Sequence, residues 1–389
     1  MVSSANLGFP RIGTNRELKK AVEGYWAGKS GLDDLLQIAK NIRVANWKLQ
    51  LNAGIDYIPS NDFSMYDQVL DTAIMLGAIP QRFAKESFNS KEDLYFAMAR
   101  GLQTDLIDVK PLEMTKWFDT NYHYLVPEIS KDTSFVLHAD KILDEYNEAK
   151  TIGINTRPVI IGPMTFLMLS KFIDNDASLS NCLEQLIPIY IELLDLLEKQ
   201  GCEWVQIDEP ILVTDLDEDQ KMSFQQAYDA ISKQTSIKKM ITTYFGSIHE
   251  NVSLLKELNI QGLHIDCVLG EKNVDLQLDD LPRDIILSLG VINGRNIWIN
   301  DFTNSISIIN KFVDIIGTDR VIVSTSCSLL HSPIDLTIED SLDQEIKAWM
   351  AFAKEKLTEI NLLNMYFDGQ NIQDVIDDNS KHISNRKTS

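Results

Sequence analysis

The sequence predicts an α/β protein built as a single (β/α)8 TIM barrel. Short apolar runs recur between longer amphipathic stretches, which is typical of repeated strand–helix units around a parallel sheet. Eight strands alternating with helices fit a closed barrel better than an open doubly wound sheet. A chain of 389 residues, 44% of them hydrophobic, is also long and apolar enough for one large barrel with insertions.

The first unit shows how each element is recognised. Residues 5–9 are mostly apolar, Pro10 and Gly13 interrupt the run, and Asn15 or Thr14 is placed to cap a helix that starts near Arg16. The same alternation predicts the other units. The expected strands are residues 5–9, 56–59, 159–162, 204–207, 240–244, 262–267, 286–292 and 320–324. The expected helices between them are residues 32–52, 182–199, 223–233, 248–257, 305–316 and 342–363.

One interval is too long for an ordinary crossover. About a hundred residues separate the second and third strands, with helical patterns at residues 64–76 and 91–106 and an aromatic run at residues 117–124. We therefore expect residues 1–367 to form one barrel domain with a largely helical insertion at about residues 63–155. A long excursion at a strand end is more often functional than accidental. Residues 368–389 are polar and are expected to form a C-terminal tail or linker.

A basic segment stands out in a very acidic chain. The formal net charge is −21, yet Arg11, Arg16, Lys19 and Lys20 face one acid, Glu17, within ten residues. Cations in a first turn disfavour the helix, because the N-terminal end of its dipole is itself positive. Free N–H groups at a helix start bind anions, and added Lys or Arg side chains extend such a site toward carboxylates or phosphates. The other interpretation is a solvated basic face.

The composition excludes several classes of partner. A pI near 4.7 argues against general nucleic-acid or anionic-membrane binding. The longest apolar stretch, residues 159–170, contains Gly162 and Pro163, and residues 1–11 lack the apolar core of a signal peptide. The four cysteines form no C-x-x-C pair, which is typical of reduced thiols. We therefore expect a cytoplasmic protein.

Polar side chains follow most of the expected strands, where barrel active sites lie. Asp208 and Glu209 are adjacent at a strand end, so only one of them can face the barrel mouth, either as an acid/base group or as a loop-fixing hydrogen bonder. Cys327 and His331 lack an orienting acid between them, which favours a buried thiol and a satisfied histidine over a nucleophile pair. The full set of rim residues is Asn61, Asp62, Asp208, Glu209, Thr242, Thr243, Asp266, Arg295, Cys327 and His331.

Several motifs are specific enough to indicate a family. They are Leu-Gly-Phe-Pro-Arg-Ile-Gly at residues 7–13, Arg-Glu-Leu-Lys-Lys at 16–20, Met-Thr-Lys-Trp-Phe at 114–118, Trp-Val-Gln-Ile-Asp-Glu-Pro at 204–210, Asn-Gly-Arg-Asn at 293–296 and Ser-Cys-Ser-Leu-Leu-His-Ser-Pro at 326–333. In this order, along essentially the whole chain, they resemble the N-terminal domain of cobalamin-independent methionine synthase. The resemblance implies methyl transfer from 5-methyltetrahydropteroyltriglutamate to homocysteine by an enzyme with two face-to-face barrels.

The resemblance also implies which residues bind substrate. The family's contacts to the folate polyglutamate tail fall on Arg16, Glu17, Leu18, Lys19 and Lys116. A triglutamate tail is a flexible polycarboxylate, so fixed cations at a helix start suit it, in agreement with the charge of this segment.

Catalytic zinc and homocysteine belong to the family's C-terminal barrel. The positions here that correspond to its zinc ligands are Thr243, Phe245, Asp266 and Cys327, so two of four ligands are lost, and Arg295 replaces its proton-donating histidine. We therefore expect no catalytic residue, no zinc and no turnover in this chain alone, which needs a C-terminal catalytic barrel, covalent or separate. Two other hypotheses remain: an autonomous TIM-barrel lyase or hydrolase using Asp208, and a non-catalytic binding barrel.

Overall fold

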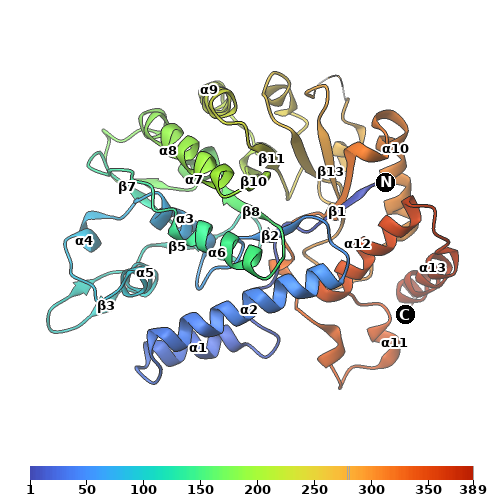
Figure 1. Ribbon diagram of the computed structural model, residues 1–389, viewed down its shortest axis with the longest axis horizontal. Coiled ribbons are helices and arrows are strands. Elements are labelled where there is room, and N and C mark those ends of the chain that lie inside the picture. The colour runs from blue at the N-terminus through green and yellow to red at the C-terminus, as the bar shows by residue number, and fades with distance from the viewer. Residues whose placement is uncertain (278, 280, 389) are drawn as a thin grey trace.

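Eight parallel strands form the barrel in the computed structural model, which describes residues 1–277, 279 and 281–388. The strands are β1 (Ser3–Ala5), β2 (Ile58–Ser60), β8 (Thr156–Ile161), β10 (Trp204–Asp208), β11 (Lys238–Thr242), β12 (Gly262–Asp266), β13 (Ile286–Ile292) and β14 (Val321–Thr325). Their spatial order is β1-β14-β13-β12-β11-β10-β8-β2. A parallel bridge between Ala5 and Tyr57 joins the two ends. The predicted TIM barrel is confirmed (Figure 1).

Strand positions agree closely with the sequence prediction. The strand expected at residues 286–292 is β13, with the same bounds, and most of the others differ by one to three residues. The first strand differs most, because β1 ends at Ala5 and residues 6–9 leave the sheet. Leu7 and Phe9 are nevertheless buried, so their apolar character reflects packing at the barrel mouth.

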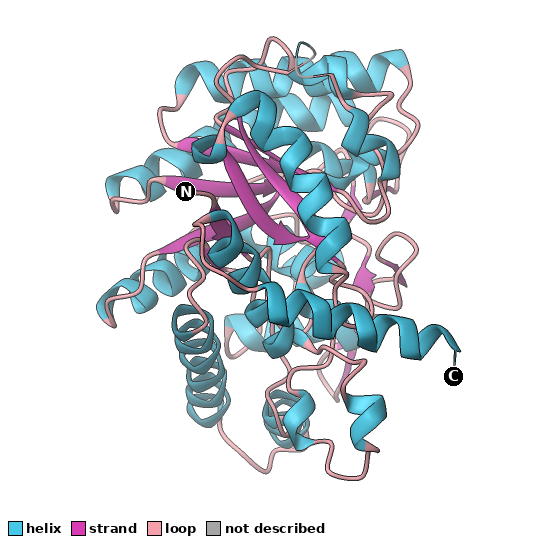
Figure 2. Cartoon of the chain, turned by 90° about the vertical axis from the view of Figure 1, so that its right-hand side faces the viewer, coloured by secondary structure: helices cyan, strands magenta, loops and turns pink. Residues whose placement is uncertain are grey.

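Helices surround the strands (Figure 2). They are α1 (Glu17–Trp26), α2 (Leu32–Asn52), α3 (Gln68–Met75), α4 (Gln81–Ala84), α5 (Lys91–Arg100), α6 (Asp140–Thr151), α7 (Pro163–Met168), α8 (Leu179–Lys199), α9 (Glu218–Gln234), α10 (Phe302–Ile316), α11 (Gln344–Lys347), α12 (Ala353–Phe367) and α13 (Gln373–Thr388). In α2, buried Leu35, Ala39 and Ile42 recur every three to four residues, which places one face against the core.

Three helix predictions were wrong in part. Residues 248–257 contain only a short 3₁₀-helix, Val252–Leu255. Residues 342–363 divide into α11 and α12. The cap expected from Asn15 or Thr14 is not formed, because Arg16 occupies the N-cap position of α1 in a left-handed conformation with φ 62°. The carboxylate of Glu17 instead accepts the Asn15 N–H at 2.9 Å and so shapes the preceding turn.

The interval between β2 and β8 holds helices and small strand pairs. The hairpin formed by β5 (Met114–Lys116) and β6 (His123–Leu125) lies in its second half. The other short strands are β3 (Leu102–Gln103) paired with β4 (Asp108–Val109), and β7 (Glu128–Ile129) paired with β9 (Lys171–Phe172). The last helix of the interval, α6, contacts β2 and β8 as an ordinary crossover helix would. A separate apolar cluster that includes Leu18, Leu35, Phe96 and Leu125 joins the insertion to α1 and α2.

The C-terminal residues form a helix, where a polar tail was expected. Helix α13 contacts α10, and Ile372, Ile376 and Ile383 are buried at helical spacing. Arg386 lies over the Trp298 ring, 4.8 Å from its centroid. Apolar packing on one face thus orders a segment whose composition is mostly polar. None of the helices in the described part is long and apolar enough to cross a membrane.

Candidate functional site

A cavity of about 270 Å³ opens at the C-terminal end of the barrel. Its walls include polar residues at the ends of three strands, β2, β10 and β14: Asn61, Asp62, Asp208 and His331, four of the rim residues expected from the sequence. Tyr244 and the apolar side chains of Leu7, Trp117, Val159 and Ile161 also line it. The strand ends therefore bring these groups to one mouth, as barrel topology requires.

Asp208 and Glu209 point in opposite directions, as expected for neighbours at a strand end. Asp208 lines the cavity, where its two oxygens accept hydrogen bonds from Gln206 Nε2 at 2.8 Å and from the Tyr244 hydroxyl at 3.0 Å. Burial raises the pKa of Asp208 to about 7. Because two donors hold its carboxylate, Asp208 is fixed in one orientation at the cavity wall.

Glu209 is fully buried on the other side of the strand. It accepts hydrogen bonds from the backbone N–H groups of Met164 and Thr165, from the Thr165 hydroxyl and from the Tyr228 hydroxyl. Burial raises the pKa of Glu209 to about 7. Of the two expected roles, Glu209 takes that of a hydrogen bonder, because it satisfies the N-terminus of α7 and ties it to α9.

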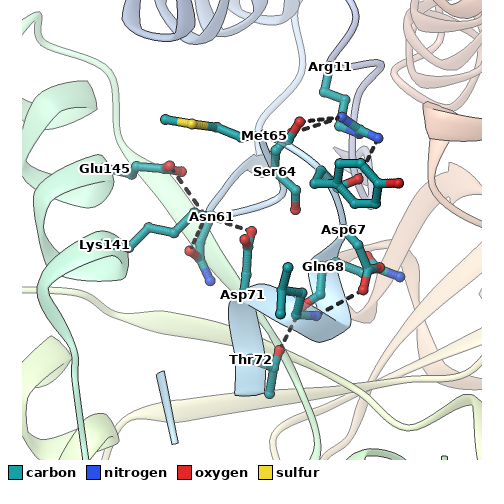
Figure 3. Close-up of polar contacts among 12 residues, drawn as sticks. Arg11, Asn61, Ser64, Met65, Asp67, Gln68, Asp71, Thr72, Lys141 and Glu145 are labelled. Carbon is teal, nitrogen blue, oxygen red and sulfur yellow. Dashed lines mark hydrogen bonds and ion pairs between the residues drawn. The ribbon is translucent and has the colours of Figure 1, made fainter. Parts of the chain in front are cut away.

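Asn61 and Asp62 follow β2 in a strained turn. Asn61 has φ 60°, and its side chain donates to Val159 O and accepts from Lys141 Nζ, both at 2.8 Å. Figure 3 shows Lys141 reaching Asn61 between Asp71 and Glu145. Next to it, Asp62 accepts the Phe9 N–H at 2.8 Å. Burial, with Glu145 nearby, raises the pKa of Asp62 to about 7 despite Lys141. A left-handed residue other than Gly is uncommon, and such strain is often found at functional sites.

The raised pKa of Asp62 predicts a specific pH dependence of stability. Between pH 4 and 7 the folded protein holds a proton on Asp62 that the unfolded chain has lost, so stability falls as pH rises through this window. Asp62→Asn removes this titration. We expect the free energy of unfolding of the wild type, relative to that of the variant, to fall by about 2 kcal/mol from pH 5 to pH 8. This value is below the full linkage effect because Asp62 is partly exposed. Urea unfolding of both proteins measures it, and a pH-independent difference would contradict the raised pKa.

The β5–β6 hairpin lies over the barrel mouth. Its tip carries Trp117, which is buried in the cavity wall, and Phe118, which has φ 51° and packs on Phe245. Arg295 forms an ion pair with Asp119 at 2.9 Å and lies over the Phe245 ring. The aromatic run noted in the sequence is therefore the roof of the site.

Cys327 and His331 do not form a nucleophile pair. The Cys327 thiol is buried, its pKa is raised by burial, and it donates to the backbone oxygen of Ser328. His331 packs against the rings of Tyr122 and Phe245, and burial together with Arg295 lowers its pKa to about 4. The histidine is therefore neutral at physiological pH.

The four positions expected to correspond to zinc ligands do not fit a metal. Phe245 offers only a ring, and the Thr243 hydroxyl donates to His264 O at 2.9 Å. Asp266 accepts backbone N–H groups from Phe245, Val268 and Leu269. No cluster of three or more His, Cys, Asp or Glu side chains in the described part of the chain is arranged to hold a metal ion.

The basic segment divides into a structural and an exposed part. Arg11 donates to the backbone oxygens of residues 64–66 and so fixes the loop after β2 (Figure 3). Arg16, Lys19 and Lys20 are exposed at the start of α1, which no side chain caps. Lys19 makes only a long, exposed ion pair with Glu23 at 3.8 Å.

The other residues expected to contact the tail include Leu18, in the first turn of α1, and Lys116, on the β5–β6 hairpin. The Leu18 side chain is buried, and its backbone N–H already donates to Ile12 O at 3.1 Å. Lys116 is exposed in β5, directly before Trp117. None of the hydrogen bonds or ion pairs found among the described residues joins Lys116 to residues 16–19. Lys116 and residues 16–19 are therefore two separate exposed basic positions.

Sequence reasoning missed part of the cavity wall. Lys141, Asp71 and Glu145 come from α6 and α3, inside the insertion, and Arg43 comes from α2. None of them lies in a motif or at a strand end. Their one sequence signal is a helical spacing, Lys141 to Glu145, that usually marks an exposed ion pair.

Comparison with known proteins agrees with this architecture. Residues 3–317 match the model of the family described as "Cobalamin-independent synthase, N-terminal domain". A 5-methyltetrahydropteroyltriglutamate–homocysteine methyltransferase from Salinibacter ruber is 48% identical over 375 residues, which cover 95% of this chain and 49% of that protein. One from Saccharomyces cerevisiae is 46% identical over 395 residues, which cover 99% of this chain and 51% of that protein. The chain thus spans about half the length of these relatives.

Solved structures share the fold at low sequence identity. A B12-independent methionine synthase from Shewanella sp. W3-18-1 aligns with a TM-score of 0.63 and 15% identity over 88% of this chain and 91% of its own. A putative vitamin-B12 independent methionine synthase from Listeria monocytogenes aligns with a TM-score of 0.62 and 14% identity over 93% of this chain and 98% of its own. Taken with the sequence matches, the chain belongs to the cobalamin-independent methionine synthase family, in which it corresponds to the N-terminal domain.

Proposed function

We propose that this chain is the folate-polyglutamate-binding half of a methyltransferase that moves a methyl group from 5-methyltetrahydropteroyltriglutamate to homocysteine and produces methionine. The names and lengths of the relatives support this proposal, because each has about as many further residues as this chain contains. In this proposal the second half carries zinc and homocysteine, and this barrel performs no chemical step. The lack of fitting zinc ligands at residues 243, 245, 266 and 327 supports that division.

The observation that carries the proposal is the open N-terminus of α1. No side chain caps this helix, and Arg16, Lys19 and Lys20 are exposed around it in a chain of net charge −21. Free backbone N–H groups and cations together attract carboxylates. Arg16 and Lys19 would bind glutamate carboxylates of the tail, and Leu18, whose N–H donates to Ile12 O, would hold the turn that presents them. Glu17 already accepts the Asn15 N–H, so its role is to shape the turn that presents Arg16.

Lys116 supplies a second cation on the hairpin. Its side chain is exposed, while the next residue, Trp117, is buried in the cavity wall. Lys116 is therefore in solvent directly beside a residue that is held at the mouth. A flexible tail of three glutamates would reach from α1 to this hairpin along the rim of the mouth.

A titration of this chain with folate ligands tests the proposal. Exposed charge pairs contribute about 0.2–1 kcal/mol each, so three of them predict roughly 3- to 150-fold tighter binding of the triglutamyl than of the monoglutamyl form. Raising salt from 0.05 to 1 M should remove most of this ratio, since the screening length falls to about 3 Å. Isothermal titration calorimetry measures both affinities. Equal affinity of the two forms at low salt would refute tail binding.

A further inference from the structure

The cavity at the barrel mouth extends beyond the strand ends, toward the helices of the insertion. Its inner wall combines apolar Leu7, Trp117, Val159 and Ile161 with the polar residues at the strand ends. Its outer wall includes polar residues of α2, α3 and α6. The proposed tail site at α1 and Lys116 consists of exposed residues, none of which lines this cavity. The cavity is therefore a separate place where a ligand of its own chemistry can bind.

The outer wall has more negative than positive charge. Lys141 lies between Asp71 at 3.4 Å and Glu145 at 3.3 Å (Figure 3). Asp62 lines the same cavity. Arg43 and the exposed Lys91 also line the cavity, and the closest partner of Arg43 is Glu148, at 2.7 Å. In this cluster the carboxyl groups of Asp62, Asp71, Glu145 and Glu148 face Lys141 and Arg43. The formal excess is two negative charges when Asp62 is ionised and one when Asp62 is protonated. Buried charge that is not neutralised favours binding of a compensating cation.

An unsatisfied carboxylate oxygen points to the same conclusion. The Glu145 side chain is 5% exposed, and its Oε2 has no hydrogen-bond partner among the described residues. Buried polar atoms in proteins nearly always have a partner, so this exception needs an explanation. Asp62 offers a second acceptor, since the Phe9 N–H contacts only its Oδ2.

We propose that this cavity binds a small organic cation, a primary ammonium group carried on a short apolar chain. The ammonium group lies at Asp62 and Glu145, where it supplies the missing charge and hydrogen-bond donors, and the chain lies against Trp117, Val159 and Ile161. A divalent metal ion fits less well, because the Lys141 ammonium already stands between the carboxylates and no metal-binding cluster is found in the described part of the chain. An anion is excluded by the excess of carboxylates.

Three probes of equal chain length test the proposal: n-butylammonium, 1-butanol and butyrate, each titrated by ligand-observed NMR. We expect saturable binding of butylammonium, binding of butanol at least about tenfold weaker, and no binding of butyrate. Asp62→Asn and Glu145→Gln should each weaken butylammonium binding about tenfold. Glu184→Gln on the exposed face of α8 is the matched control and should have no effect.

Two results would overturn the proposal. One is equal affinity for butylammonium and butanol in the wild-type protein, a comparison that requires no variant to fold. The other is full butylammonium affinity in both Asp62→Asn and Glu145→Gln, with folding checked by circular dichroism. Triglutamyl folate binding, measured in the same variants, should stay at the wild-type level. If the wild-type protein did not bind triglutamyl folate, the tail site alone would be refuted and the proposal of a cation site would be unaffected.

Discussion

Glu209→Ala should destabilise the protein by about 4 kcal/mol or more. The carboxylate is completely buried and accepts four hydrogen bonds, two of them from backbone N–H groups at the start of α7. Alanine removes the acceptor of all four hydrogen bonds at once. The four donor groups are then unsatisfied, because water does not reach this buried position. Each unsatisfied buried donor costs about 1–3 kcal/mol, and the losses are only partly additive. Urea unfolding followed by circular dichroism measures the change.

Two matched variants separate this effect from a general response to mutation. Tyr228→Phe removes one of the four donors with its acceptor left in place, and should cost about 1 kcal/mol. Glu184→Ala, at an exposed position of α8, should stay within about 0.5 kcal/mol of wild type. If Glu209→Ala were as mild as Tyr228→Phe, Glu209 would not be the anchor between β10, α7 and α9 that its contacts indicate.

The barrel was predictable because its strands are buried on both faces and contrast with the helices around them. The run at residues 286–292 is apolar apart from Ser288 and Gly290, and its bounds match β13. The first strand was displaced for a physical reason. Leu7 and Phe9 are as buried as strand residues, and sequence alone does not distinguish burial in a sheet from burial in a loop. Helix α13 did carry a signal, since Ile372, Ile376 and Ile383 recur at helical spacing within a polar segment.

The site was predictable where topology alone decides it. Asn61 and Asp62 follow β2, Asp208 ends β10 and His331 follows β14, and a parallel barrel brings all strand ends to one mouth. Lys141 and Glu145 belong to a helix about eighty residues beyond β2, and only tertiary packing places them beside Asn61. The cap of α1 was missed for a related reason, because Glu17 reaches back to the Asn15 N–H and allows Arg16 to adopt a left-handed conformation.

Removal of both lysines expected to bind the folate tail should have the largest effect on ligand binding. Lys19 and Lys116 lie on separate elements and are exposed, so Lys19→Ala with Lys116→Ala should leave stability within about 0.5 kcal/mol of wild type. Their loss should remove most of the difference in affinity between triglutamyl and monoglutamyl folate, a reduction of roughly tenfold for the triglutamyl form. Affinity for the monoglutamyl form should change little, because it lacks the additional carboxylates.

The control for this experiment must remove the same charge elsewhere. In a chain of net charge −21, losing two lysines weakens attraction for any anion, whether or not the lysines touch it. Lys199→Ala with Lys233→Ala removes two exposed lysines at the ends of α8 and α9, on the opposite side of the barrel from α1 (Figure 1). If both double variants reduced the triglutamyl preference equally, long-range attraction would explain it and the site at residues 16–19 and 116 would be wrong. A reduction confined to the Lys19 and Lys116 variant would show direct contact, since screening at moderate salt suppresses the long-range effect first.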